Sequence, residues 1–114
     1  MPDYAISQLG GLPSKPCPYG FAQRAFADLP GGAASLHLVH IKADARVHYH
    51  QRMTGIYLVL EGNGEIELDG QRHPVKPLTA IYIKPDCRHR AIGNLKIINI
   101  PIPAFDEKNE WFDP

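Results

Sequence analysis

The stretch from His48 to Gly64 reads HYHQRMTGIYLVLEGNG. Its first and third residues are histidines, and residues two apart in a strand point to the same face, about 6.6 Å apart along the chain. An apolar run typical of a strand follows from Ile56 to Glu61. Gly62-Asn63-Gly64 then predicts a tight turn. We therefore expect two consecutive strands, of which the first presents both imidazoles on one side.

Short strand patterns continue on both sides of this stretch. After the turn, acids at 65, 67 and 69 alternate with Ile66 and Leu68, a period of two that places the acids in water and the aliphatic side chains inside. Further strands are predicted at Ala34 to Ile41, Arg46 to His50, around Val75, Thr79 to Ile83, Arg88 to Ile92 and Leu95 to Ile102. About eight short strands without intervening helices predict an all-β sandwich or barrel.

Composition limits the possible partners and compartment. The 114 residues fit one domain, and 44% hydrophobic with 21% charged residues is ordinary for a globular protein. Twelve basic residues balance twelve acidic ones, so no basic excess favours nucleic acid. We find neither a secretory leader nor an apolar run long enough for a membrane, and two isolated cysteines are typical of reduced thiols. The expected location is the cytoplasm, and no residues remain for a helix-turn-helix unit.

The chain divides into three expected parts. Residues 1–33, rich in glycine and proline from position 10 to 20, predict an extended N-terminal arm of the kind that often packs on a partner subunit. Residues 34–102 form the barrel. Residues 103–114 form a tail whose aromatic side chains, Phe105, Trp111 and Phe112, either fold back over an apolar surface or fray into solvent.

A third histidine, His89, lies on another predicted strand. A closed sheet can bring it opposite His48 and His50. Three neutral imidazoles at about 2.0 to 2.1 Å would leave a metal ion at least one open position, as in catalytic sites. By spacing alone, an H-x-H pair facing solvent is the more ordinary interpretation, because most histidines in proteins bind no metal.

Two motifs resemble those of the cupin superfamily. The stretch HYHQRMTGIYLVLEGNG is similar to the first cupin motif, and Pro85-Asp86-Cys87-Arg88-His89 is similar to the second. The resemblance covers about Ser35 to Ile102. It implies a small single-domain cupin, with a double-stranded β-helix or jelly-roll barrel and one divalent transition metal (iron, zinc, nickel, copper, cobalt or manganese) inside. His48, His50 and His89 would be the metal ligands, and small cupins commonly form homodimers.

The sequence departs from the cupin pattern at two positions. The glutamate of the first motif falls on Gly55, and a glycine of the second is replaced by Asp86. Two interpretations of Gly55 are open. Either the site has lost its metal and binds only a ligand or partner, or it is a three-histidine centre in which water, substrate, Gln51 or Thr54 fills the vacancy. Asp86 suggests a different turn before His89.

The ligand set constrains the chemistry. Three neutral ligands leave a divalent ion its full charge, so the site favours small anionic molecules such as an enolate, a thiolate or a carboxylate. It resembles the three-histidine cupin dioxygenases. Two alternatives stand beside a metal-dependent oxygenase: a non-catalytic small-ligand-binding or sensing cupin, and a metal-dependent isomerase or lyase.

Tyr57 is the candidate catalytic residue, because it lies two positions beyond Gly55 on the same strand and would face the same interior. It would hydrogen-bond a bound substrate, although simple packing in the barrel is the alternative. His37 and His40, three apart, point to opposite faces, and we expect neither in the site. His73 follows a turn and is expected to be solvated.

Four more residues near the motifs have two interpretations each. Cys87 is either a thiolate near the metal or a spectator thiol, and its turn position favours the spectator. Arg52, Arg88 and Arg90 either steer an anion to the pocket mouth or form surface salt bridges.

Overall fold

The computed structural model describes residues 3–17, 20–42, 45–106, 108 and 110–113. Apart from one 3-10 turn, η1 (Leu9–Gly11), its regular elements are all strands. They are β1 (Lys15–Cys17), β2 (Gly20–Ala25), β3 (Leu36–Ile41), β4 (His48–His50), β5 (Thr54–Glu61), β6 (Gly64–Leu68), β7 (Gln71–Val75), β8 (Ala80–Ile83), β9 (His89–Ile92), β10 (Leu95–Ile102) and β11 (Glu110–Phe112). The expected all-β class is confirmed.

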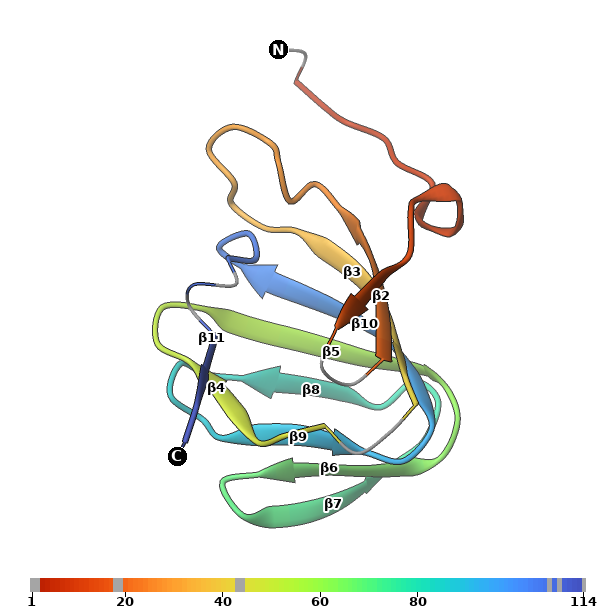
Figure 1. Ribbon diagram of the computed structural model, residues 1–114, viewed down its shortest axis with the longest axis vertical. Coiled ribbons are helices and arrows are strands. Elements are labelled where there is room, and N and C mark those ends of the chain that lie inside the picture. Colours follow the sequence, from red (N-terminus) through yellow and green to blue (C-terminus); the bar gives the residue numbers. More distant parts are fainter. Residues whose placement is uncertain (1–2, 18–19, 43–44, 107, 109, 114) are drawn as a thin grey trace.

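Two antiparallel sheets face each other as in a jelly-roll barrel (Figure 1). The larger has the order β1-β2-β3-β10-β5-β8, and the smaller has the order β11-β4-β9-β6-β7. Strands distant in sequence are therefore neighbours: β10 lies between β3 and β5, and β9 lies between β4 and β6. This interleaving brings the histidines of the first motif, on β4, beside the histidine of the second motif, on β9, in one sheet.

Apolar side chains that alternate with outward-facing residues along the strands form the core between the two sheets. Val39, Val59 and Ile97 face inward from three adjacent strands of the larger sheet, and Ile66 faces them from the smaller one, each at most 3% exposed. On the outer side of β6, Glu67 forms ion pairs with arginines of β7 and β9. The register predicted from the acids and aliphatics of residues 65–69 is thus confirmed.

The turn after β5 requires glycine. Gly62 has a φ of +94°, and a Cβ there would lie 2.3 Å from the carbonyl oxygen of Asn94. Only a residue without a side chain allows that approach. The turn sets the β5–β6 register and hence the inward face of β6.

The N-terminal segment contains more sheet than the sequence predicted. Within residues 1–33, β2 pairs with β3 from Gly20 to Ala25, and β1 pairs with β2. The run Phe-Ala-Gln-Arg-Ala has few β-branched residues, so its strand signal was weak. Residues 3–8 still extend beyond the barrel (Figure 1), with Tyr4 71% and Ile6 88% exposed, whereas the carbonyls of Gly10 and Leu12 accept hydrogen bonds from Gln23 on β2. Residues 1, 2, 18 and 19 lie outside the described part.

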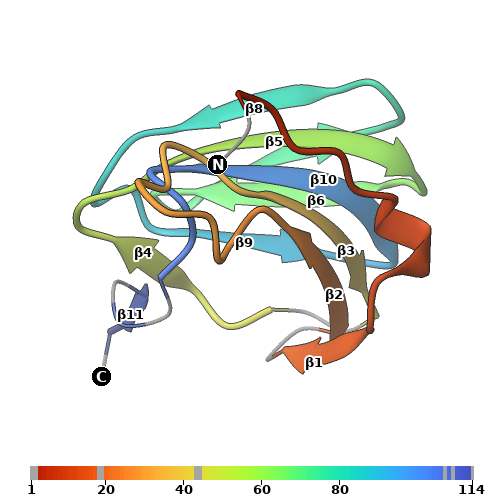
Figure 2. The same cartoon turned by 90° about the horizontal axis from the view of Figure 1, so that it is seen from above.

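The tail folds back onto the barrel. Its strand β11 adds to the edge of the smaller sheet beside β4 (Figure 2). Of the two expectations for the aromatic tail, the structure therefore supports packing, although Trp111 stays 46% exposed. Residues 107, 109 and 114 of this segment lie outside the described part.

Candidate metal centre

The three predicted histidines come together inside the barrel. His48 and His50 extend from one face of β4, and His89 on β9 is the direct cross-strand partner of His48. The ring centroids of His48 and His89 are 4.3 Å apart, and that of His50 lies 5.4 Å from His48 and 5.6 Å from His89. One nitrogen from each ring lies within 4.8 Å of the others. This separation suits three donors around one ion.

Backbone carbonyls orient two of these rings. His48 Nδ1 lies 3.0 Å from the Arg46 carbonyl oxygen, and His89 Nδ1 lies 2.8 Å from that of Cys87. A carbonyl only accepts, so each Nδ1 donates its proton and each Nε2 keeps its lone pair. Metal-binding histidines are held in this way. The donors therefore fit a divalent transition metal.

Burial keeps His89 in the form that binds metals. The side chain is 2% exposed. Burial and, after it, the neighbouring His48 lower the pKa of His89 to about 3. The imidazole is therefore neutral near pH 7, as a metal ligand must be.

No motif carboxylate reaches the cluster from β5. A Cβ built at Gly55 would lie 3.8 Å from Asn99 Oδ1 and 3.8 Å from the Tyr57 ring, so this position faces the interior but carries no donor. Thr54 points to the opposite face, because it precedes Gly55 on the strand, and Gln51 is exposed. These positions favour water or substrate over Gln51 or Thr54 in the vacancy, and what fills it remains a prediction.

Tyr57 lies beside the histidines as predicted. Its side chain is 7% exposed, and its ring centroid is 6.0 Å from that of His89. Burial raises the pKa of Tyr57, and the negative charge of Glu110 adds to the rise. The phenol is therefore protonated and can donate a hydrogen bond.

Asn99 is a site residue that the sequence analysis missed. It is the cross-strand partner of Tyr57. With Tyr57 and His48 it lines a small cavity of about 10 Å³ whose remaining wall is apolar: Val39, Ile41, Ala45, Ala91 and Ile97. The signal was present in the sequence, because Asn99 is an amide in the inward register between Ile97 and Pro101.

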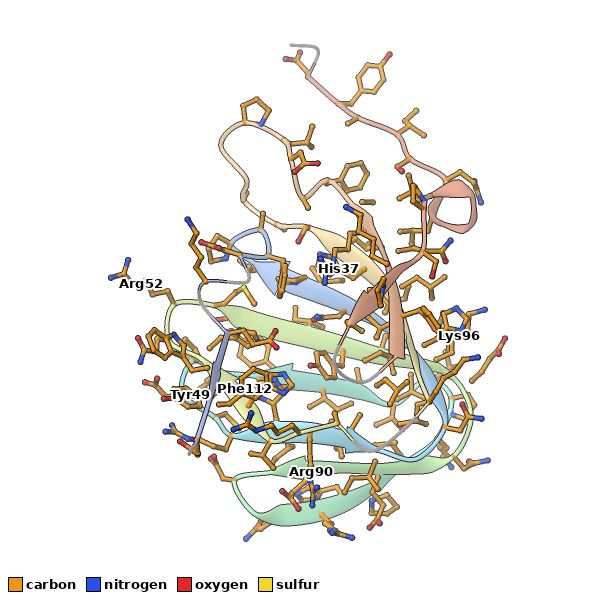
Figure 3. All side chains as sticks on the ribbon, viewed as in Figure 1. His37, Tyr49, Arg52, Arg90, Lys96 and Phe112 are labelled. Atoms are coloured by element: carbon orange, nitrogen blue, oxygen red, sulfur yellow. The ribbon has the colours of Figure 1, made fainter. Side chains whose placement is uncertain are left out.

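His37, which we did not expect in the site, is also buried. It is 2% exposed, and its Nε2 lies 2.9 Å from Ser35 Oγ. Burial and, secondarily, the charge of Arg24 lower its pKa to about 4. It lies on β3 opposite Asn99 and is outside the three-histidine cluster. Figure 3 shows it at the upper end of the barrel.

The other two histidines lie away from the site. His40 pairs with Phe21 and Lys96 on the outer face of the larger sheet. His73 on β7 is exposed, as expected.

The arginines near the motifs form surface contacts. Arg88 forms an ion pair with Asp113 at 3.2 Å and stacks on Tyr49 at 3.6 Å. Arg90 bonds Glu67 at 3.1 Å on the outer face of the smaller sheet. Arg52 extends away from the barrel (Figure 3). Of the two interpretations, these positions favour surface contacts over steering at a pocket mouth.

The turn before His89 contains a left-handed residue. Asp86 has a φ of +69°, a conformation that aspartate tolerates better than most residues. Asp86 thus adopts the left-handed conformation that favours glycine. Burial raises the pKa of the next residue, Cys87, and Asp69 adds to the rise. A protonated thiol at this position favours the spectator interpretation.

The C-terminal strand covers the cluster. The Phe112 ring lies 6.0 Å from the His48 ring, and the Arg46 guanidinium stacks on Phe112 at 4.7 Å. Figure 3 places Phe112 on the barrel side of β11. This cover was one of the two expectations for the tail, but its position over the histidines was not predicted.

Comparison with known proteins agrees with this geometry. The family model for the cupin domain matches residues 30–96. A protein from Planctomyces limnophilus of known crystal structure is 42% identical, with a TM-score of 0.89 over 98% of this chain and 97% of that one. An uncharacterised protein of Methanocaldococcus jannaschii is 33% identical over 63% of this chain, which spans 61% of that relative's length.

More distant structures share the fold. A variant of Streptomyces Pac13 solved with uridine has a TM-score of 0.81 at 16% identity, over 97% of this chain and 92% of that one. Pac13 is described as a nucleoside dehydratase. At this level of identity the likeness shows the fold alone. Within the part of the chain that the structure describes, no helix is long and apolar enough to cross a membrane.

Proposed function

This chain belongs to the cupin domain family, and on that premise we propose that His48, His50 and His89 hold one divalent transition metal in an enzyme centre for a small anionic molecule. The convergence of three imidazoles, two of them oriented by backbone carbonyls, supports this proposal. Burying polar nitrogens is costly unless they are used. That cost favours a working metal site over a decayed one.

Iron, zinc, nickel, copper, cobalt and manganese are all candidates, because imidazole suits most of them. When bound, the ion would supply Lewis-acid chemistry and attract an enolate, a thiolate or a carboxylate. Tyr57 would donate a hydrogen bond to the bound molecule. Asn99, beside it, offers both a donor and an acceptor.

We favour an oxygenase as the reaction class. The cavity beside His48 measures about 10 Å³ and is largely apolar, which is room for about one water-sized molecule. Dioxygen is apolar and would match the largely apolar wall of this space. The apolar side chains around it would exclude bulk water from the reacting groups.

A metal-dependent lyase or isomerase is the second candidate. The adjacent Tyr57 and Asn99 favour it, because a protonated phenol can donate a proton to the leaving group of a substrate. The same fold serves a nucleoside dehydratase, Pac13. Turnover without oxygen consumption would distinguish this class from an oxygenase.

Elemental analysis of protein purified without chelator tests the metal site. We expect about one ion per chain in the parent, and its loss in His48→Ala, His50→Ala and His89→Ala with the fold retained by circular dichroism. His73→Ala, on exposed β7, should keep the metal, as should Tyr57→Phe. A parent that takes up neither iron, zinc nor nickel would overturn the proposal and favour a ligand-binding cupin. Oxygen-uptake screens with diketones and thiols follow if metal is present.

We also propose that the protein is a homodimer. The segment of residues 3–8 extends beyond its own barrel, and its exposed Tyr4 and Ile6 are suited to contact a second copy.

A further inference from the structure

Gly55 leaves the three histidines without the carboxylate of the first motif. We infer that Glu110, on the C-terminal strand β11, supplies a carboxylate ligand to the ion held by His48, His50 and His89. This inference rests on the metal site proposed above. The missing carboxylate would then come from β11 in the smaller sheet, whereas Gly55 lies on β5 in the larger sheet.

The register of β11 gives the direction of Glu110. In the antiparallel pair of β11 and β4, Glu110 is opposite His50, Trp111 is opposite Tyr49, and Phe112 is opposite His48. Directly paired residues share a face of the sheet, and successive residues alternate. Glu110 therefore shares the face of His50.

The neighbours of Glu110 support this orientation. Phe112 contacts His48, with ring centroids 6.0 Å apart, so it points inward. Trp111 is 46% exposed, so it points outward. Glu110 is two residues from Phe112 and must point inward again.

The electrostatics agree with the register. The charge of Glu110 contributes to the raised pKa of Tyr57, and the Tyr57 ring lies 6.0 Å from that of His89. The carboxylate is therefore close to the same group of side chains. Cβ atoms of directly paired residues are about 4.5 to 5.5 Å apart; the Glu110 carboxylate lies outside the cluster of three histidines in the structure, and a change of rotamer would bring it toward the imidazoles.

A carboxylate from β11 would alter the charge at the site. Three imidazoles leave a divalent ion with two positive charges, whereas one glutamate reduces them to one. Glu110 is half-buried, and a buried carboxylate is costly unless a cation is close to it. The ion would provide that cation, so the last strand of the chain completes the coordination shell.

The test is cobalt binding by the full-length protein. Glu110→Gln keeps the size of the side chain and removes its charge. We expect Co²⁺ affinity, measured by competition with a chelating dye, to fall by about 10-fold or more, and the absorption spectrum of bound Co²⁺ to change. Glu61→Gln is the matched control, because that side chain is 72% exposed and outside the site. It should leave affinity and spectrum as in the parent.

A rescue variant sharpens the test. In the Glu110→Gln background, Gly55→Glu restores a carboxylate from β5, where a Cβ meets its nearest neighbours at 3.8 Å or more. We expect it to recover most of the lost affinity. Glu110→Gln with the affinity and spectrum of the parent would overturn the inference, as would equal losses in Glu110→Gln and Glu61→Gln.

His89→Ala distinguishes failure of the proposed metal site from failure of the inferred role of Glu110. If it keeps Co²⁺, the proposed metal site itself is wrong. If it loses Co²⁺ while Glu110→Gln behaves as the parent, only the role of Glu110 is wrong.

Discussion

His37 makes the stability of the protein sensitive to acid. Its pKa of about 4 in the folded protein lies below its ordinary value of 6.5, because the ring is buried and Arg24 is near. Between these two values the unfolded chain binds a proton that the folded protein does not. The free energy of unfolding therefore falls as the pH drops from about 6.5 toward 4, by up to about 1.4 kcal/mol per pH unit for one proton.

Replacing His37 should reduce this dependence. We predict that His37→Gln, which can still hydrogen-bond Ser35, loses less stability between about pH 7 and pH 4.5 than the parent does. Urea unfolding of metal-free protein across this range measures the difference. His73→Gln, at an exposed position, should follow the parent curve. If the free energy of unfolding fell with pH as steeply in His37→Gln as in the parent, His37 would be protonated in the folded state and the prediction would be wrong.

At the scale of single residues, the sequence predicted the direction of a side chain correctly where that direction depends on one strand alone. His48 and His50 share a face because they are two apart on β4, and Tyr57 follows Gly55 inward for the same reason. Their roles in binding and catalysis remain predictions. Asn99 could have been found from its inward register between Ile97 and Pro101, whereas Glu110, inferred above as a ligand, comes near the histidines only because β11 pairs with the distant strand β4.

Among the elements, β11 covers the three histidines with its inner face and exposes its outer face to solvent. Phe112 packs toward His48, while Trp111 lies on the outer face. The strand is three residues long and pairs with β4, and the ion pair of Arg88 with Asp113 holds the residue after it. Because the ladder is short, small changes in packing should change how often the cover opens.

We therefore predict that Phe112→Ala speeds removal of the bound metal by a chelator several-fold, with a loss of roughly 1 kcal/mol in stability. Trp111→Ala, on the opposite face of the same strand, should change the extraction rate little. Stopped-flow extraction with a coloured chelator measures both variants. Equal acceleration by the two variants would mean that β11 acts through general stability and not as a cover.

Which elements were predictable depended on their composition. The apolar runs that became β3, β5 and β10 and the alternating β6 were recognised nearly to their ends. The segments β1, β2 and β11 were missed as strands, because they are short or rich in alanine, proline and polar residues. Pairing with β3 and β4 makes them strands, and such tertiary context is not visible in a local pattern.

For the whole molecule, the outer face of the larger sheet is the notable surface. Leu38, Ile98, Leu58 and Ala80 form one continuous row across β3, β10, β5 and β8 on the side away from the core. Tyr82, 65% exposed, extends this apolar face beside Ile56. With a formal net charge of zero, the chain has little charge repulsion to oppose association.

This face and the extended arm lead to the last prediction, that two copies pair through their larger sheets. Leu58→Glu places a charge in the middle of the apolar row, and burying it in a dimer would be unfavourable. We expect size-exclusion chromatography with light scattering to show a dimer for the parent and a monomer for Leu58→Glu. Gln71→Glu adds the same charge at the exposed start of β7 and should remain dimeric. A monomeric parent at micromolar concentration would rule out the dimer. A dimeric Leu58→Glu variant would mean that the dimer interface lies on another surface.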